Sequence, residues 1–236
     1  MNNETEYWKL IKEISSLNEK WVDTLATKAT IIDNLIKSIK PNSKTLLFTS
    51  FNPIALNLAD HYDVTVICSS NSVFDMSAVK QIDNIEQLTQ KFDIVVALDE
   101  YFTYGDSIEA QRDLLDQVVK VTNGWLITTL QDYKNFAPHK KNQIDTSYVS
   151  NGNNYIMLES NVADKTDKQL WYHYRFCIKE HNELITIGPS SRRTMYFKQL
   201  AKYSSDAGSK QYVIQKNLLY KGFFSKNFEH IITVNF

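Results

Sequence analysis

Glycine, proline and cysteine are scarce in this chain of 236 residues, which has 6 Gly, 4 Pro and 2 Cys. So little glycine and proline, combined with 43% hydrophobic residues, excludes a disordered low-complexity chain and favours a folded globular protein. The two cysteines, Cys68 and Cys177, show neither metal-binding nor redox spacing. We therefore expect both to be buried thiols in a reducing compartment.

An excess of one charge and long apolar runs are also missing. The net charge is −1, so there is no general basic field of the kind that drives nucleic-acid binding. No stretch approaches the ~20 apolar residues of a membrane span, and the first residues lack a cationic segment followed by an apolar run. These absences predict a soluble, cytoplasmic protein that needs no membrane and is not expected to bind nucleic acid. No pattern indicates an oligomeric state.

The clearest local pattern occupies residues 92–132. It contains two short strands that are apolar throughout, as expected in a parallel sheet with helices on both faces. Between them lie an acidic and aromatic turn and a helix with clear ends. Asp106 or Ser107 is expected to cap this helix, with Glu109 three residues beyond Asp106, and Asn123-Gly124 is expected to end it in a left-handed turn. The pattern predicts one βαβ unit.

Similar patterns place the other elements. Helical spacing of apolar residues predicts two amino-terminal helices, at 4–17 and 22–39. A helix is expected to begin sharply at Asn52-Pro53, a second to occupy 85–91, and residues 134–154 are polar and loop-like. The remaining expected elements are strands at 45–50, 63–69, 79–83, 155–160, 170–180 and 183–188, a helix at 194–204, and an antiparallel pair at 211–220 and 230–236.

Alternating strands and helices, followed by a helix and a terminal antiparallel pair, give the element order of the class I S-adenosylmethionine-dependent methyltransferases. The chain resembles this superfamily over residues 43–133 and 195–236, most strongly in FDIVVALDEYFTY and NGWLITTL. The resemblance implies an α/β fold with a Rossmann-like, doubly wound, seven-stranded and mostly parallel sheet. It also implies an amino-terminal helical cap at 1–42 and a methyltransferase-like domain at 43–236, with an inserted loop and β-hairpin roof at 134–194.

Two motifs of that superfamily are absent. The turn after the first strand reads Thr49-Ser50-Phe51-Asn52-Pro53, without the glycines that let a cofactor lie against bare backbone. The end of the second strand reads CSSN and carries no carboxylate for the ribose hydroxyls. By resemblance, S-adenosylmethionine would lie over these two strand ends, with Asp83 facing the adenine and Asp99 along the methionine portion. The cofactor set is Ser50, Phe51, Asn52, Ser69, Ser70, Asp83 and Asp99.

Candidate catalytic residues lie beyond the carboxyl ends of the expected strands, where open parallel sheets bind ligands. Carboxylates attract a cationic methyl donor and aromatic faces favour cationic groups, which suits the acidic and aromatic turn after residue 98. A loop histidine could act as a base. The catalytic set is Glu100, Tyr101, Tyr104, Tyr133 and His139. The alternatives are that Tyr101 and Tyr104 only pack, that Asp106 only caps a helix, and that His139 is a solvated surface residue.

The sequence therefore favours a methyltransferase that transfers a methyl group in line to a small-molecule acceptor, because the reaction needs alignment more than a fixed catalytic triad. One alternative is a non-catalytic binding or assembly protein of the same fold that has lost the cofactor turn. A weaker alternative is a nucleic-acid methyltransferase. The basic clusters at 138–141 and at Arg192-Arg193 either meet an acidic substrate or form solvated faces. The four other histidines are expected to be structural, and no metal site is expected.

Overall fold

A seven-stranded sheet forms the centre of the computed structural model, in the order β10-β11-β5-β4-β1-β2-β3. The structure describes residues 19–48, 52–67, 79–82, 84–98, 101–103, 107–131, 143–150, 154–167, 169–178, 184–220 and 228–236. Five strands are parallel: β1 (Lys44–Phe48), β2 (Asp63–Ile67), β3 (Lys80–Ile82), β4 (Phe92–Ala97) and β5 (Thr122–Gln131). The last two, β10 (Gln211–Tyr220) and β11 (Phe228–Asn235), pair antiparallel to each other, and β11 pairs antiparallel to β5.

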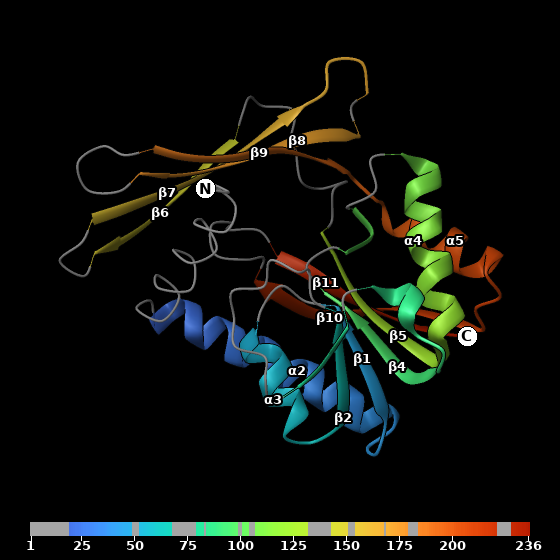
Figure 1. Ribbon diagram of the computed structural model, residues 1–236. Helices are drawn as coiled ribbons and strands as arrows, with labels where there is room; N and C mark the ends of the chain where they lie inside the picture. The colour runs from blue at the N-terminus through green and yellow to red at the C-terminus, as the bar shows by residue number, and fades with distance from the viewer. Residues whose placement is uncertain are drawn as a thin grey trace.

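Helices cover both faces of this sheet (Figure 1). Helices α2 (Glu19–Ile39) and α3 (Asn52–Ala59) pack on one face, and α4 (Ile108–Val121) and α5 (Phe197–Asp206) on the other. Successive strand residues point to opposite faces, so Val95 joins the core under α4 while Val96 joins the core under α2. Both faces of the central strands are buried, which explains why β1, β2 and β4 are mainly apolar and confirms the predicted doubly wound sheet.

The second amino-terminal helix is part of this core. Ile32 and Ile36 of α2 are fully buried against the sheet, together with Leu58 of α3. Residues 1–18, which include the first predicted helix, lie outside the described residues. The division into a cap at 1–42 and a domain at 43–236 stays a prediction, but α2 itself is a packing layer of the sheet.

A separate four-stranded antiparallel sheet, the roof sheet, lies between β5 and α5 in the chain. Its order is β6-β7-β8-β9, with β6 (Gln143–Ser150), β7 (Asn154–Ala163), β8 (Leu170–Ile178) and β9 (Leu184–Arg193). The antiparallel β8-β9 pair confirms the predicted hairpin. The prediction that 134–154 is a loop was wrong for β6, where the polar composition hides a period-two alternation of Ile144, Thr146 and Tyr148.

Two other local predictions were wrong. In place of a helix at 85–91, a single 3-10 turn η1 (Ile85–Gln87) forms, because Asn84 caps it through the backbone N–H of Glu86 and Leu88 is already extended. Helix α4 is capped by Ser107 as predicted, but it ends in extended backbone at Thr122 rather than in a left-handed turn. Gly124 has another role. A Cβ there would lie 2.8 Å from the carbonyl oxygen of Asp93, so glycine permits the close approach of β5 to β4.

Among the described helices, none combines the length and hydrophobicity needed to cross a membrane.

Candidate functional site

The carboxyl ends of the five parallel strands meet along one edge of the large sheet, here called the carboxyl edge. The roof sheet lies on this side of the molecule (Figure 1). Strand ends are held together by hydrogen bonds: the Leu98 amide donates to the Phe48 carbonyl at 3.1 Å, and the Thr128 hydroxyl donates to the Ala97 carbonyl at 2.7 Å. In open α/β sheets this edge is where ligands bind.

Tyr101 forms an aromatic wall at the junction of β1 and β4. It begins the 3-10 turn η2 (Tyr101–Thr103), and its backbone N–H donates to the Leu98 carbonyl at 3.2 Å. Its ring centre lies 4.6 Å from that of Phe48 and 5.5 Å from that of Phe102, which is fully buried. Burial raises the pKa of Tyr101 to about 12. At neutral pH the hydroxyl is therefore protonated, and Tyr101 is suited to donate a hydrogen bond or to present its ring rather than to act as a base.

A buried ion pair lies at the same edge, between α2 and the end of β5. Lys28 Nζ is 3.2 Å from Glu229 Oε2, and the two side chains are only 3% and 2% exposed. Glu229 stands directly opposite Gln131 in the pairing of β11 with β5, and Gln131 is also buried. Breaking such a pair is costly, whereas replacing both partners by apolar side chains is often neutral. The pair therefore fixes α2 against the end of β5 more than it adds stability.

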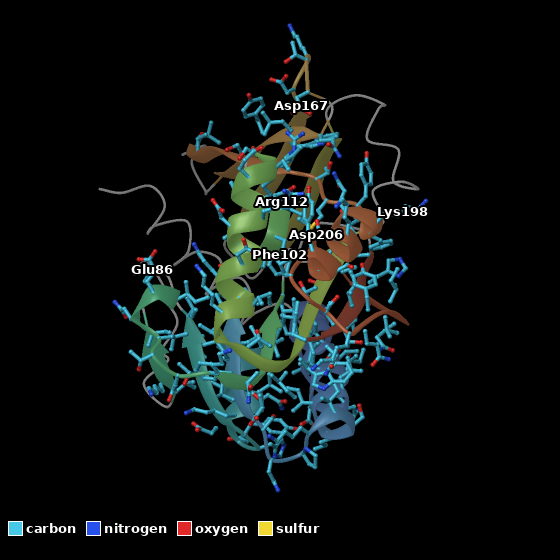
Figure 2. All side chains as sticks on the ribbon, turned by 90° about the vertical axis from the view of Figure 1, so that its right-hand side faces the viewer. Glu86, Phe102, Arg112, Asp167, Lys198 and Asp206 are labelled. Carbon is cyan, nitrogen blue, oxygen red and sulfur yellow. The ribbon has the colours of Figure 1, made fainter. Side chains whose placement is uncertain are left out.

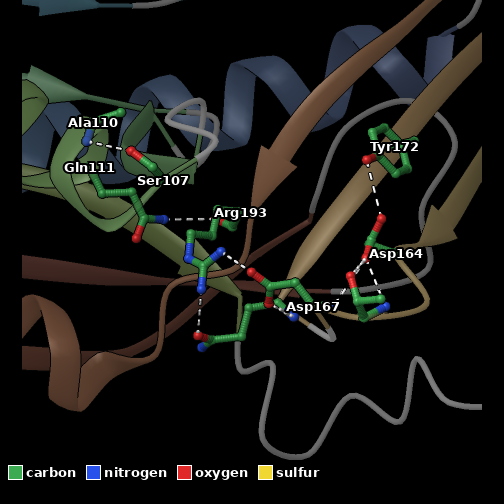
Figure 3. Close-up of polar contacts among 9 residues, drawn as sticks. Ser107, Ala110, Gln111, Asp164, Asp167, Tyr172 and Arg193 are labelled. Atoms are coloured by element: carbon green, nitrogen blue, oxygen red, sulfur yellow. Dashed lines mark hydrogen bonds and ion pairs between the residues drawn. The ribbon is translucent and has the colours of Figure 1, made fainter.

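The roof sheet is attached to the large sheet where β9 passes into α5 (Figure 3). The Arg193 guanidinium forms an ion pair with Asp167 and donates to Gln169 Oε1 at 3.3 Å. The Thr194 amide donates to the Gln169 carbonyl at 2.8 Å. From α4, the Gln111 side-chain amide donates to the Arg193 main-chain carbonyl, also at 2.8 Å. These contacts join the turn between β7 and β8, the end of β9 and the first turns of α4.

The turn between β7 and β8 is itself held by Asp164. Its carboxylate accepts hydrogen bonds from the Thr166 hydroxyl, the Thr166 amide and the Asp167 amide, and from the Tyr172 hydroxyl. These bonds, the Thr166 hydroxyl first, hold the pKa of Asp164 well below its usual range. The turn is therefore locally ordered even though it lies at the surface.

The outer side of α4 and α5 carries a different kind of cluster. Arg112 stacks over the Tyr203 ring, 4.9 Å from its centre, and its guanidinium lies 3.8 Å from the Asp206 carboxylate. Figure 2 shows Arg112 and Asp206 facing each other across the two helices. Both side chains are half exposed, so this pair joins the helices at the surface.

Two of the predicted site residues can be placed. Tyr101 lies at the carboxyl edge, as expected, and Asn52 is the first residue of α3, directly after the β1 turn. The other predicted site residues lie outside the described residues: Ser50, Phe51, Ser69, Ser70, Asp83, Asp99, Glu100, Tyr104, Tyr133 and His139. Their roles stay predictions. In the described part of the chain, no group of three histidine, cysteine or acidic side chains could hold a metal ion.

The predicted basic pair and the histidines have mixed outcomes. Arg193 does not belong to a solvated face, because its side chain is 11% exposed and pairs with Asp167. His230 packs edge-on against the Phe197 ring at 5.3 Å, in keeping with a structural role. The sequence reasoning missed Lys28, Glu229 and Gln111. The first two are far apart in the chain, and Gln111 looks like any polar helix residue, so no local signal indicated them.

Comparison with known proteins gives likeness in fold alone. No protein-family model matches the sequence, and no curated protein matches it either. An S-adenosylmethionine-dependent methyltransferase from Clostridium acetobutylicum has a similar structure, with a TM-score of 0.68 and 12% identity over 97% of this chain and 98% of that one.

Two further similar structures are named as sugar-modifying enzymes. The amino pentose methyltransferase from Micromonospora echinaspora, involved in calicheamicin biosynthesis, gives a TM-score of 0.66 and 8% identity over 90% of this chain and 92% of that one. The sugar N-methyltransferase from Streptoalloteichus gives 0.65 and 12% identity over 89% of this chain and 87% of that one. The chain therefore has the Rossmann-like fold of the class I S-adenosylmethionine-dependent methyltransferases.

Proposed function

We propose that this chain is an S-adenosylmethionine-dependent methyltransferase with a small-molecule acceptor, and that the acceptor is an amino sugar. The observation that carries the proposal is the extent of the likeness. The likeness covers about nine-tenths or more of the chain. It therefore extends beyond the seven-stranded sheet, which is shared by enzymes that act on many unrelated acceptors. Two of the similar structures are named for an amino pentose and a sugar nitrogen.

The carboxyl edge fits the cofactor in outline. The ends of β4, β1, β2 and β3 follow one another along the edge, which gives room for an extended nucleoside and amino-acid ligand. Tyr101 and Phe48 supply an aromatic wall at the β4-β1 junction. The residues proposed to hold the cofactor are Ser50, Phe51, Asn52, Ser69, Ser70, Asp83 and Asp99.

In a glycine-free turn, the N–H groups that follow Pro53 in α3 take over contacts that bare glycine backbone makes elsewhere. Helix α3 begins at Asn52, directly after that turn. Free N–H groups at a helix start favour an anionic group, which suits the carboxylate of the cofactor's amino-acid portion. The proposal therefore predicts that this end of the ligand lies over the start of α3.

Bound S-adenosylmethionine supplies its methyl group as an electrophile. The chain's own residues must then align the acceptor nitrogen, exclude water and take up the proton that the amine loses. Tyr101 is protonated and so orients the acceptor rather than deprotonating it. Glu100 and His139 are proposed as proton acceptors, with Tyr104 and Tyr133 as walls of the acceptor site.

The test is an acceptor screen with the purified full chain. S-adenosylhomocysteine release is measured with amino sugars, both free and as nucleoside-diphosphate derivatives, and with the matching sugars that carry a hydroxyl in place of the amine. The proposal predicts release with at least one amino sugar and none with its hydroxyl counterpart. Release with both, or with an oligonucleotide only, would contradict the amino-sugar assignment. The Glu100→Gln and His139→Gln variants then show which residue takes the proton.

A further inference from the structure

Gln111 occupies an unusual place in α4. The helix begins directly after the segment that holds most of the predicted catalytic residues, and Gln111 lies in its first turns. The side chain is fully buried. Its Nε2 donates to the main-chain oxygen of Arg193 at 2.8 Å, whereas its buried Oε1 accepts no hydrogen bond from the described residues (Figure 3).

Packing alone does not explain a glutamine at this position. A buried polar atom without a partner destabilises the folded state, and the hydrogen bond from the other end of the amide compensates for it only in part. Methionine has a similar length, forms helices equally well and would remove the unsatisfied Oε1, but it would take this donor away from the Arg193 carbonyl. Methionine could not form the hydrogen bond to the Arg193 carbonyl. A role specific to glutamine would therefore act through that hydrogen bond.

The group that receives this bond belongs to a rigid junction. Arg193 is the last residue of β9, and its guanidinium holds Asp167 and Gln169 in the turn between β7 and β8. The next residue, Thr194, donates to Gln169 as well. A constraint on the Arg193 carbonyl therefore acts on two strands of the roof sheet together.

We propose that Gln111 is a positioning residue that fixes the roof sheet relative to α4 and, through it, relative to the carboxyl edge. Its hydrogen bond sets where the roof lies before any acceptor arrives. The consequence for the acceptor rests on the function proposed above: with the roof in place, the acceptor binds to a preformed site, and the cofactor side of the edge is unaffected.

The first test does not depend on any ligand. Amide hydrogen exchange of the full chain is compared for wild type, Gln111→Met and the matched control Gln117→Met, which makes the same change six residues further along the same helix. We expect exchange at 169–172 and 184–194 to quicken by about tenfold in Gln111→Met only, the effect of losing one hydrogen bond of ordinary strength. The helix itself should keep its wild-type exchange. Equal exchange at the roof in all three proteins would overturn the proposal.

The second test concerns the acceptor. With the amino sugar that the screen identifies, Gln111→Met should raise KM by about tenfold while kcat and the cofactor Kd stay within about twofold of wild type. A purely structural role would lower the fraction of active protein, and hence kcat, without changing KM. An unchanged KM would overturn the positioning role. If wild type binds no cofactor, the methyltransferase proposal fails, and the exchange experiment still decides the role of Gln111.

A third measurement asks whether Gln111 and Arg193 act together. Arg193→Lys keeps the charge and the main-chain carbonyl but loses the planar fork that holds Asp167 and Gln169. If the two residues act through one junction, the double variant should quicken roof exchange little more than either single change. Additive effects would show that they act separately and would contradict the proposed path.

Discussion

Two ion pairs at opposite edges of the seven-stranded sheet differ in their exposure to water. At the amino edge, where the parallel strands begin, Asp93 pairs with Lys40 at 2.6 Å and accepts from the Lys44 amide at 3.0 Å. Lys40 is half exposed there. At the carboxyl edge, the Lys28-Glu229 pair and Gln111 are buried.

This difference distinguishes polar groups that add stability from polar groups that hold elements of the fold in position. The Lys40-Asp93 pair at the amino edge stays close to water and needs no more explanation than an ordinary surface ion pair. Buried ions and a half-satisfied amide are poor ways to gain stability. We therefore expect the Lys28-Glu229 pair and Gln111 to hold α2 and the roof sheet in place more than to add stability.

The largest effect is expected from Lys28→Met, which leaves the Glu229 carboxylate buried without its ammonium. The loss in unfolding free energy should be about 3–5 kcal/mol, and the double variant Lys28→Met/Glu229→Leu should recover most of it. The matched change at the amino edge, Lys40→Met, should cost less than about 1 kcal/mol because that lysine is half exposed.

Urea unfolding of the four proteins measures these differences. A double variant as unstable as Lys28→Met would mean that the pair itself stabilises the fold. Similar losses for Lys28→Met and Lys40→Met would remove the contrast between the two edges.

The next largest loss of stability is expected at the amino edge. Gly124→Ala would bring a Cβ within 2.8 Å of the Asp93 carbonyl oxygen, and that oxygen is part of the backbone of β4. The strands must shift apart, at a cost of about 1–3 kcal/mol. Thermal unfolding checks the loss, and the cofactor affinity should not change because the carboxyl edge is untouched. A variant as stable as wild type would show that the sheet relaxes freely there.

An acid titration tests the same edge. The hydrogen bond from Lys40, followed by that from the Lys44 amide, lowers the pKa of Asp93 below its ordinary value. The stability gained is therefore present above the unfolded pKa of about 3.9, and is lost as the pH falls through the folded pKa. Asp93→Asn should cost about 1 kcal/mol at pH 7 and progressively less below about pH 4.

Thermal unfolding of both proteins between about pH 7 and pH 3 gives this comparison. The two curves should converge at the acid end. A gap that stays constant with pH would show that the Asp93 charge is not what the variant removes.

The smallest effect is expected at the aromatic wall. Tyr101→Phe keeps the ring contacts with Phe48 and Phe102, so the cofactor affinity should stay near wild type. Acceptor turnover should fall if the protonated hydroxyl orients the acceptor. Absorbance titration should also lose one tyrosine that ionises near pH 12. Unchanged turnover would limit Tyr101 to a packing role.

The mostly parallel sheet with helices on both faces could be predicted because most of its strands are mainly apolar and because the order of elements resembles that of a known fold. Adjacent apolar residues such as Val95 and Val96 pack on opposite faces, as expected when helices cover both faces of a sheet. Local signals failed where tertiary contacts decide. Gly124 resembles a helix stop in sequence, but the carbonyl of Asp93 on a neighbouring strand determines its role.

The sequence predicts the edge of the sheet at which the candidate site lies, but it does not predict the contacts within the site. Topology alone places Tyr101 at the end of β4. Nothing near Lys28 in the sequence indicates that its partner is Glu229, on the last strand, and an amphipathic helix would normally place that lysine in water. Gln111 likewise has its partner on the roof sheet, far along the chain.

We propose that the carboxyl edge holds S-adenosylmethionine although the first turn has no glycine. Isothermal titration of the folded full chain with S-adenosylmethionine and with S-adenosylhomocysteine tests it most directly, with Asp99→Ala as the site variant and Lys40→Met as the amino-edge control. We predict micromolar binding of both ligands to wild type and to Lys40→Met, and none to Asp99→Ala. No heat with either ligand, from wild-type protein shown to be folded, would contradict the claim and favour a non-catalytic protein of the same fold.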